Sequence, residues 1–136
     1  MLSALFRYRW RVSIAGTLVL AIAVAAGLGW REQHRSDKVA RAMTGGNPTQ
    51  APAAIRRYGC AGCHTIPGIP GGDGQVGGSL ADIIHRVYVG GVVTNSPDNL
   101  VKWIVSPQAF SPRSAMPATG ITEAEARDIA AYLYSR

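Results

Sequence analysis

An uncharged run near the N-terminus most constrains what this chain can fold into. Residues 12–30 contain no charged side chain and are rich in Ala, Val, Leu and Ile. At the helical rise of about 1.5 Å per residue they span roughly 28 Å, close to the hydrocarbon thickness of a bilayer. Trp10 and Trp30 bracket the run, and arginines lie beyond them, as expected at the two membrane interfaces. We therefore expect a basic N-terminus, residues 1–11, followed by a single transmembrane helix over residues 12–30.

A cleaved signal peptide is the alternative interpretation of this run, because Ala23-Val24-Ala25 fits the small-x-small pattern of a cleavage site. The run is longer than the usual apolar region of a signal peptide, about 7 to 15 residues, which favours an uncleaved anchor. Small residues recur along it at every fourth position: Ser13, Thr17, Ala21, Ala25 and Gly29. Such a face lets another helix approach closely and predicts a partner transmembrane helix, although alanine-rich membrane helices also produce it by chance.

The positive charge lies beside this run. The net charge is +6, and residues 1–51 hold seven basic against two acidic side chains. Residues 52–136 hold seven basic against six acidic side chains, so this part is nearly neutral despite a pI of about 9.9. A nucleic-acid interface needs a basic face on the folded part. We therefore expect a membrane protein that binds no nucleic acid.

Residues 31–51 are predicted to be a polar linker that contains Gly and Pro. Residues 31–43 can prolong the preceding helix, but Gly45, Gly46 and Pro48 interrupt it. As a flexible coil this linker reaches roughly 25 Å, which keeps whatever follows it near the membrane surface.

Residues 52–136 are predicted to form one small all-α domain. A short helix follows Pro52, a second has Ser96 as its N-cap and ends at Pro107, and a third opens on the capping-box pattern of residues 122–125. Residues 59–91 hold ten glycines and show no strand alternation. Loops of that length need something to wrap around.

The sequence Cys60-Ala61-Gly62-Cys63-His64 is the C-x-x-C-H pattern of covalent c-type haem attachment. Cysteines three positions apart on a helical turn lie on one face, so both thiols can reach the two vinyl groups at one porphyrin edge. His64 can then bind the iron as proximal ligand. A redox dithiol expects a βαβ context that is absent, and a zinc site lacks an evident fourth ligand. We therefore expect one covalent haem c.

Two side chains of residues 52–136 are candidates for the distal ligand. Met116 lies in a stretch rich in Pro and Gly, 52 residues after His64 and on no apolar helix stripe, which favours ligation over core packing. His85 is the alternative. It is more typical of a surface position or of a haem propionate edge.

With these residues, the stretch from Ala53 to Arg136 resembles a class I c-type cytochrome with one haem and His/Met ligation. The resemblance implies a small all-α domain wrapped around the haem. It implies thioether bonds from Cys60 and Cys63, His64 as the proximal ligand and Met116 as the distal ligand.

Three further residues enter through the same resemblance. The stretch from Gly77 to Leu80 is similar to a Gly-Pro-x-Leu segment whose Pro carbonyl orients the proximal His, with Gly78 where Pro is usual. A carbonyl at Gly78 can still accept that hydrogen bond from a softer loop. Trp103 falls where such domains often place a ring near a propionate, and core packing is the alternative for it.

Iron bound by protein on both faces has no open position, which favours electron transfer over oxygen chemistry. We expect a membrane-bound electron carrier, not an enzyme, that passes electrons to a respiratory terminal oxidase or is one of its subunits. Residues 60–80 and 95–116 resemble cytochrome domains found with haem-copper terminal oxidases. A quinol:cytochrome c reductase is the other expected partner. The alternatives are a haem peroxidase, a gas-binding haem protein, or an accessory subunit of a quinol- or substrate-oxidising complex.

The family resemblance also implies a location. Bacteria attach haem c outside the cytoplasmic membrane, whereas the basic residues on both sides of the run do not decide the topology. We expect a single-pass protein of the bacterial inner membrane with its N-terminus in the cytoplasm and its haem domain in the periplasm.

Overall fold

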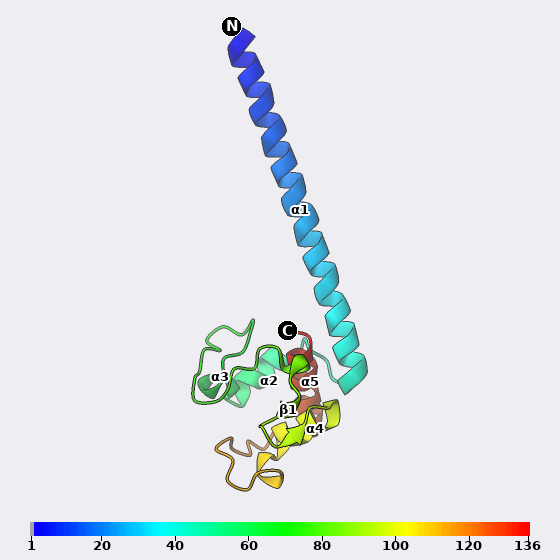
Figure 1. Ribbon diagram of the computed structural model, residues 1–136, viewed down its shortest axis with the longest axis vertical. Coiled ribbons are helices and arrows are strands. Elements are labelled where there is room, and N and C mark those ends of the chain that lie inside the picture. The colour runs from blue at the N-terminus through cyan, green and yellow to red at the C-terminus, as the bar shows by residue number, and fades with distance from the viewer. Residues whose placement is uncertain (1) are drawn as a thin grey trace. The chain divides into compact units, whose positions relative to one another are not determined.

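A computed structural model describes residues 2–136 of the chain, with side chains from residue 14 onward. The chain forms two compact units, one that ends at Arg35 and one that comprises Ser36–Arg136 (Figure 1). We call the second the C-terminal unit.

The N-terminal unit is helical. Its described residues belong to α1 (Leu2–Thr44), which contains the uncharged run. By length and composition the stretch Ile14–Thr44 qualifies as a helix that can cross a membrane, and none of its most apolar window is buried. The Thr17 hydroxyl donates a hydrogen bond of 2.9 Å to the Ile14 carbonyl, so this polar group is satisfied within the helix, as lipid requires.

The C-terminal unit is mostly helical, as expected. After α1 its elements are α2 (Ala51–Arg57), α3 (Cys60–Cys63), η1 (Ile83–His85), β1 (Tyr88–Val89), β2 (Val93–Thr94), α4 (Pro97–Val105), η2 (Pro107–Ala109) and α5 (Glu123–Tyr134). All three predicted helices are present. The antiparallel hairpin of β1 and β2 was not predicted; its turn contains Gly90 and Gly91, both left-handed, a conformation that glycine adopts without strain.

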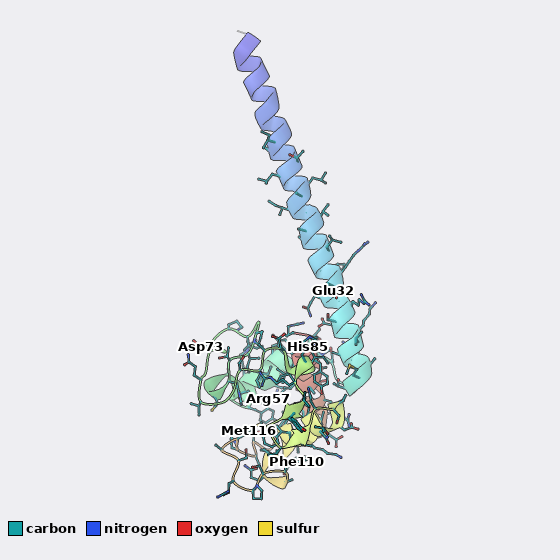
Figure 2. The ribbon with its side chains drawn as sticks, viewed as in Figure 1. Glu32, Arg57, Asp73, His85, Phe110 and Met116 are labelled. Carbon is teal, nitrogen blue, oxygen red and sulfur yellow. The ribbon has the colours of Figure 1, made fainter. Side chains whose placement is uncertain are left out.

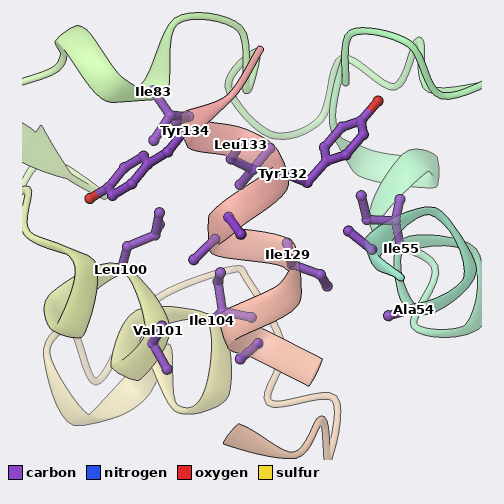
Figure 3. Packing of buried hydrophobic residues seen from close by; sticks show 14 of the residues in the cluster. Ala54, Ile55, Ile83, Leu100, Val101, Ile104, Ile129, Tyr132, Leu133 and Tyr134 are labelled. Carbon is purple, nitrogen blue, oxygen red and sulfur yellow. The ribbon is translucent and has the colours of Figure 1, made fainter. Parts of the chain in front are cut away.

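Helix α5 lies at the centre of the core, between α2 and α4 (Figure 3). Every residue of 129–135 is buried. On one side Ala54 and Ile55 of α2 contribute to the core, and on the other Leu100, Val101 and Ile104 of α4 do so. A helix that is buried on all faces must be packed against other elements on every side. Helices α2 and α4 pack against α5 on two of these sides.

The helix starts match the sequence signals. Ser96 Oγ accepts a hydrogen bond from the Asn99 N–H at 3.2 Å, and Pro97 takes the first helical position of α4. At the start of α5, Thr122 and Glu125 form the complete reciprocal capping box. These side chains satisfy N–H groups that a helix end leaves without partners.

The first part of the C-terminal unit differs from the linker that we expected over residues 31–51. Residues 36–48, which we call the docked segment, are bonded to α5 and to the C-terminal residue. Arg136 Nη1 lies 3.0 Å from Asp37 Oδ1, and Arg127 Nη1 donates to the Thr44 carbonyl at 3.0 Å. The Asn47 N–H donates to Asp128 Oδ1 at 2.6 Å. Contacts with residues far away in the sequence therefore hold residues 36–48, which the sequence alone predicts to be part of a flexible linker.

Small side chains make this docking sterically feasible. Ala40, Thr44, Gly46 and Pro48 are buried. A Cβ at position 46 would lie 2.0 Å from the Arg127 carbonyl oxygen, so that only glycine fits there. The reach of a flexible coil therefore does not apply to residues 36–48.

Candidate haem site

The two cysteines occupy a single helical turn. Helix α3 begins after Gly59, whose φ of 71° turns the chain out of α2, and the His64 N–H donates to the Cys60 carbonyl at 3.0 Å. Both thiols are free of disulfides; Cys60 is half-buried and Cys63 is exposed. Burial raises the pKa of the Cys60 thiol above its usual value. Positions 60 and 63 share one side of the turn, as the spacing predicted.

The His64 ring is oriented by the loop that follows the motif. His64 Nδ1 lies 2.7 Å from the Gly78 carbonyl oxygen. Because a carbonyl only accepts, Nδ1 donates this bond, and in the neutral ring Nε2 then keeps a free lone pair, the form of imidazole that binds a metal. Gly78 thus makes the contact that the resemblance implied, without the proline.

Gly77 lies against the same imidazole. A Cβ at position 77 would fall 2.3 Å from His64 Cε1 and 2.6 Å from Nδ1, so the backbone itself contacts the ring. Two backbone hydrogen bonds hold the loop in place, from the Gly77 N–H to the Cys63 carbonyl at 2.7 Å and from the Leu80 N–H to the Thr65 carbonyl at 2.8 Å. The softness expected of Gly78 is therefore offset by bonds on both sides of it.

Met116 lies in the loop between η2 and α5. Its side chain is half-buried. Its N–H donates to Ser114 Oγ at 3.2 Å, and its carbonyl accepts from Gln108 Nε2 at 2.7 Å. His85, the alternative ligand, is exposed in η1, and Figure 2 shows the two residues in different parts of the unit. Which of them binds the iron stays a prediction.

Trp103 packs beneath the hairpin. A Cβ at Gly90 would lie 2.3 Å from Trp103 Cη2, and the ring centroids of Trp103 and Phe110 are 6.2 Å apart. These contacts agree with the core-packing alternative for Trp103. A place near a propionate stays a prediction.

Leu80 belongs to a group of half-buried apolar side chains that pack against the core. The group comprises Tyr58, Cys60, Ala61, Leu80, Ile84, Val93, Trp103 and Val105. It contains Cys60, Leu80 and Trp103 of the predicted site. Half-buried apolar side chains suit contact with an apolar macrocycle better than contact with water.

The donor set fits haem c and not the alternatives. In the described part of the chain no group of three or more His, Cys, Asp or Glu could hold a metal ion, which argues against zinc. The same residues contain one two-stranded hairpin and no βαβ unit, which argues against a thioredoxin-like dithiol. Two thiols on one turn beside an oriented imidazole match covalent haem attachment.

The sequence model of the family described as cytochrome c matches residues 53–136. The chain belongs to the cytochrome c family. Members of the cytochrome c family bind haem c covalently, so one haem c is the cofactor of this cytochrome domain. No curated protein and no solved structure matches the chain.

The sequence included Gly77 in the segment that ends at Leu80 but did not predict that its backbone contacts the His64 ring, and it did not point to Gln108 beside Met116. Gln108 left no signal, because its hydrogen bond goes to a backbone carbonyl and imposes no motif.

A cavity of about 260 Å³ lies elsewhere in the cytochrome domain, between α4, η2 and the start of α5. Phe110 and Val101 give it an apolar wall, and Lys102 and Glu123 line its rim. It contains none of the predicted site residues.

Proposed function

We propose that this protein is a membrane-anchored cytochrome that passes single electrons to a respiratory terminal oxidase, or that serves as a subunit of one. The observation that carries the proposal is the His64 imidazole, which donates from Nδ1 to Gly78 and offers Nε2 beside both attachment cysteines. Haem c supplies a reversible one-electron couple when bound. The remaining steps belong to the side chains of this chain.

His64 would hold the haem iron through Nε2. The hydrogen bond from Nδ1 to the Gly78 carbonyl fixes the tautomer and raises the basicity of the ring. Close packing of Gly77 keeps the imidazole from rotating. A ligand that does not move between oxidation states lowers the reorganisation that each electron transfer requires.

Met116 would hold the iron through its thioether sulfur. If His64 and Met116 both bind it, neither oxygen nor peroxide would reach the iron unless one of them leaves, and the site would transfer electrons rather than perform oxygen chemistry. A thioether favours the reduced state and raises the reduction potential towards the range that a terminal oxidase uses.

The long apolar helix supports a membrane anchor. We place this anchor in the bacterial inner membrane and the haem domain in the periplasm because bacteria attach haem c there. Residues 52–136 carry nearly equal numbers of basic and acidic groups, so long-range electrostatic steering of a soluble partner is weak. A membrane anchor raises encounter frequency by another route. A quinol:cytochrome c reductase is the matching donor, and the oxidase assignment is supported by the resemblance of residues 60–80 and 95–116.

Purification of the full chain in mild detergent tests the proposal. Mass spectrometry and haem spectra of the co-purifying chains should reveal a haem-copper oxidase, and the cytochrome should be low-spin when oxidised and reduced. Tight binding of carbon monoxide by the wild-type protein would contradict the proposal and favour a gas-binding or peroxidase function. Unchanged electron transfer in an oxidase complex that lacks this chain would instead favour an accessory subunit.

A further inference from the structure

We propose that Gln108 is a positioning residue that holds Met116 in its ligating conformation. The inference rests on the proposed His/Met ligation and assigns what keeps the distal ligand in place. Gln108 Nε2 donates to the Met116 carbonyl at 2.7 Å and lies 3.5 Å from the Ser114 carbonyl. The amide thus contacts two backbone carbonyls of the ligand loop, one on each side of Ala115.

The loop has little else to hold it. In the described part of the chain, no backbone group of residues 115–121 takes part in a backbone–backbone hydrogen bond. Both backbone groups of Met116 are instead bonded to side chains, the carbonyl to Gln108 and the N–H to Ser114 Oγ at 3.2 Å. Pro117, the next residue, has no N–H to donate. These two side chains therefore set the conformation of the Met116 peptide.

Gln108 lies in a segment that is itself held by backbone hydrogen bonds and by packing on the core. It lies in η2, where the Ala109 N–H donates to the Ser106 carbonyl at 3.1 Å and the Ser111 N–H to the Pro107 carbonyl at 3.0 Å. Pro107 is fully buried, and the Phe110 ring packs on Trp103 of α4. Figure 2 shows Phe110 and Met116 in the same part of the unit. The hydrogen bond from Gln108 therefore fixes the Met116 loop to a segment that packs on the core.

Loss of this bond increases the fraction of molecules whose methionine has left the iron. An external ligand competes with Met116 for ferric iron, so its apparent affinity rises in proportion to the open fraction. A hydrogen bond of ordinary strength changes such an equilibrium by roughly five- to tenfold. A side chain that served stability alone would lower the melting temperature and leave this competition unchanged.

The test uses the full holoprotein in mild detergent, with imidazole as the competing ligand. Gln108→Ala should raise the affinity of the ferric protein for imidazole roughly five- to tenfold, weaken the long-wavelength band of methionine-ligated ferric iron, and lower the reduction potential. Gln108→Glu keeps the shape but turns a carboxylate oxygen towards two carbonyls, so it should have at least the same effect. Gln50→Ala is the matched control: this side chain is exposed, and no hydrogen bond of it is seen. It should leave all three measurements at their wild-type values.

Ser114→Ala keeps the proposal falsifiable if the Gln108 variants fail to fold with haem attached. It removes the other bond to the Met116 peptide and should raise imidazole affinity as well, and the double variant should deviate from additivity because both bonds hold one peptide. Wild-type imidazole affinity in Gln108→Ala overturns the positioning role while leaving methionine ligation standing. A wild-type protein without the methionine band overturns the ligation itself, and the positioning role with it.

Discussion

At the scale of single residues, two adjacent glycines differ in how they contact the His64 ring. The backbone of Gly77 contacts the imidazole, whereas a Cβ at Gly78 would meet nothing within 4 Å. The carbonyl of Gly78 nonetheless makes the one hydrogen bond that orients the ring. The first glycine is therefore required by space, and the second is replaceable.

Substitutions at these two positions should act in opposite directions. Gly77→Ala should displace the ring, since its Cβ overlaps His64 Cε1, and destabilise the holoprotein by about 1–3 kcal/mol. Gly78→Pro keeps the carbonyl and removes freedom from the unfolded chain, so it should stabilise by about 0.4–1 kcal/mol. Thermal unfolding monitored at the haem absorption measures both. Equal effects of the two substitutions would show that the ring is not held as described.

Met116 and His85 make the second pair of contrasting residues. Met116→Ala should open the iron to cyanide and carbon monoxide and lower the reduction potential, because a thioether stabilises the reduced state. His85→Ala should leave the oxidised spectrum unchanged, since the proposed site uses Met116 and not His85 as the second iron ligand. Ligand titrations and potentiometry of both variants decide the matter, and the reverse pattern would assign bis-histidine ligation.

At the scale of elements, one carboxylate joins the first helix of the cytochrome domain to the last. Glu125 accepts from the Thr122 hydroxyl at 2.7 Å and from the Tyr58 hydroxyl at 2.8 Å, and it pairs with Arg57 at 2.6 Å. The hydrogen bond from Thr122, followed by that from Tyr58, lowers the pKa of Glu125. Glu125 of the capping box therefore also bonds the start of α5 to the C-terminal end of α2.

This network predicts an acid dependence of stability. Because the folded pKa of Glu125 lies below its unfolded value, the contribution is present above the unfolded pKa of about 4.3 and is lost as the pH falls through the folded pKa. Melting temperatures measured across this range should fall less steeply for Glu125→Gln than for wild type. Thr122→Ala removes the main cause of the lowered pKa, so the acid-dependent loss should be smaller than in wild type and should be complete at a higher pH. Parallel profiles for all three proteins would contradict this assignment.

The sequence predicted the elements whose signals are local. Ser96 and Thr122 mark helix starts within three residues of the groups they cap, and the motif at residues 60–64 fixes the attachment turn by its spacing. The bonds of Gln108 and of the docked segment were not predictable in this way. Arg127 and Thr44 are far apart in sequence, and an arginine that caps a distant helix end looks like any surface arginine.

Docking of residues 36–48 can be tested by proteolysis. Gly46→Ala places a Cβ 2.0 Å from the Arg127 carbonyl, a backbone atom that cannot move aside cheaply. The variant should therefore release the segment and become sensitive to protease within it, whereas the wild type should resist cleavage there because Thr44, Gly46 and Pro48 are buried. Gln50→Ala, an exposed change nearby, should remain resistant. Mass spectrometry of the fragments locates the cuts, and equal cleavage of wild type and Gly46→Ala would refute the docking.

At the scale of the whole molecule, the small-residue face of the apolar helix predicts a partner. Ala21→Leu combined with Ala25→Leu should weaken co-purification with the proposed respiratory complex without altering the haem spectrum, because close helix approach needs small side chains. Leu20→Ala changes an exposed side chain off that face and serves as control. Quantitative mass spectrometry of the purified complex measures the effect. Loss of the complex in the control alone would mean that the packing face is misassigned.

The docked segment also determines how far the chain can be truncated from its N-terminus without loss of the folded unit. The family match begins at residue 53, but the compact unit begins at Ser36. A fragment that starts at residue 53 would leave Asp128 and Arg136 without the partners they have here and would uncover the part of the molecule in which Ala40 and Thr44 are buried. A soluble fragment for crystallography or electrochemistry should therefore start at Ser36, and the shorter one should aggregate or unfold at a lower temperature.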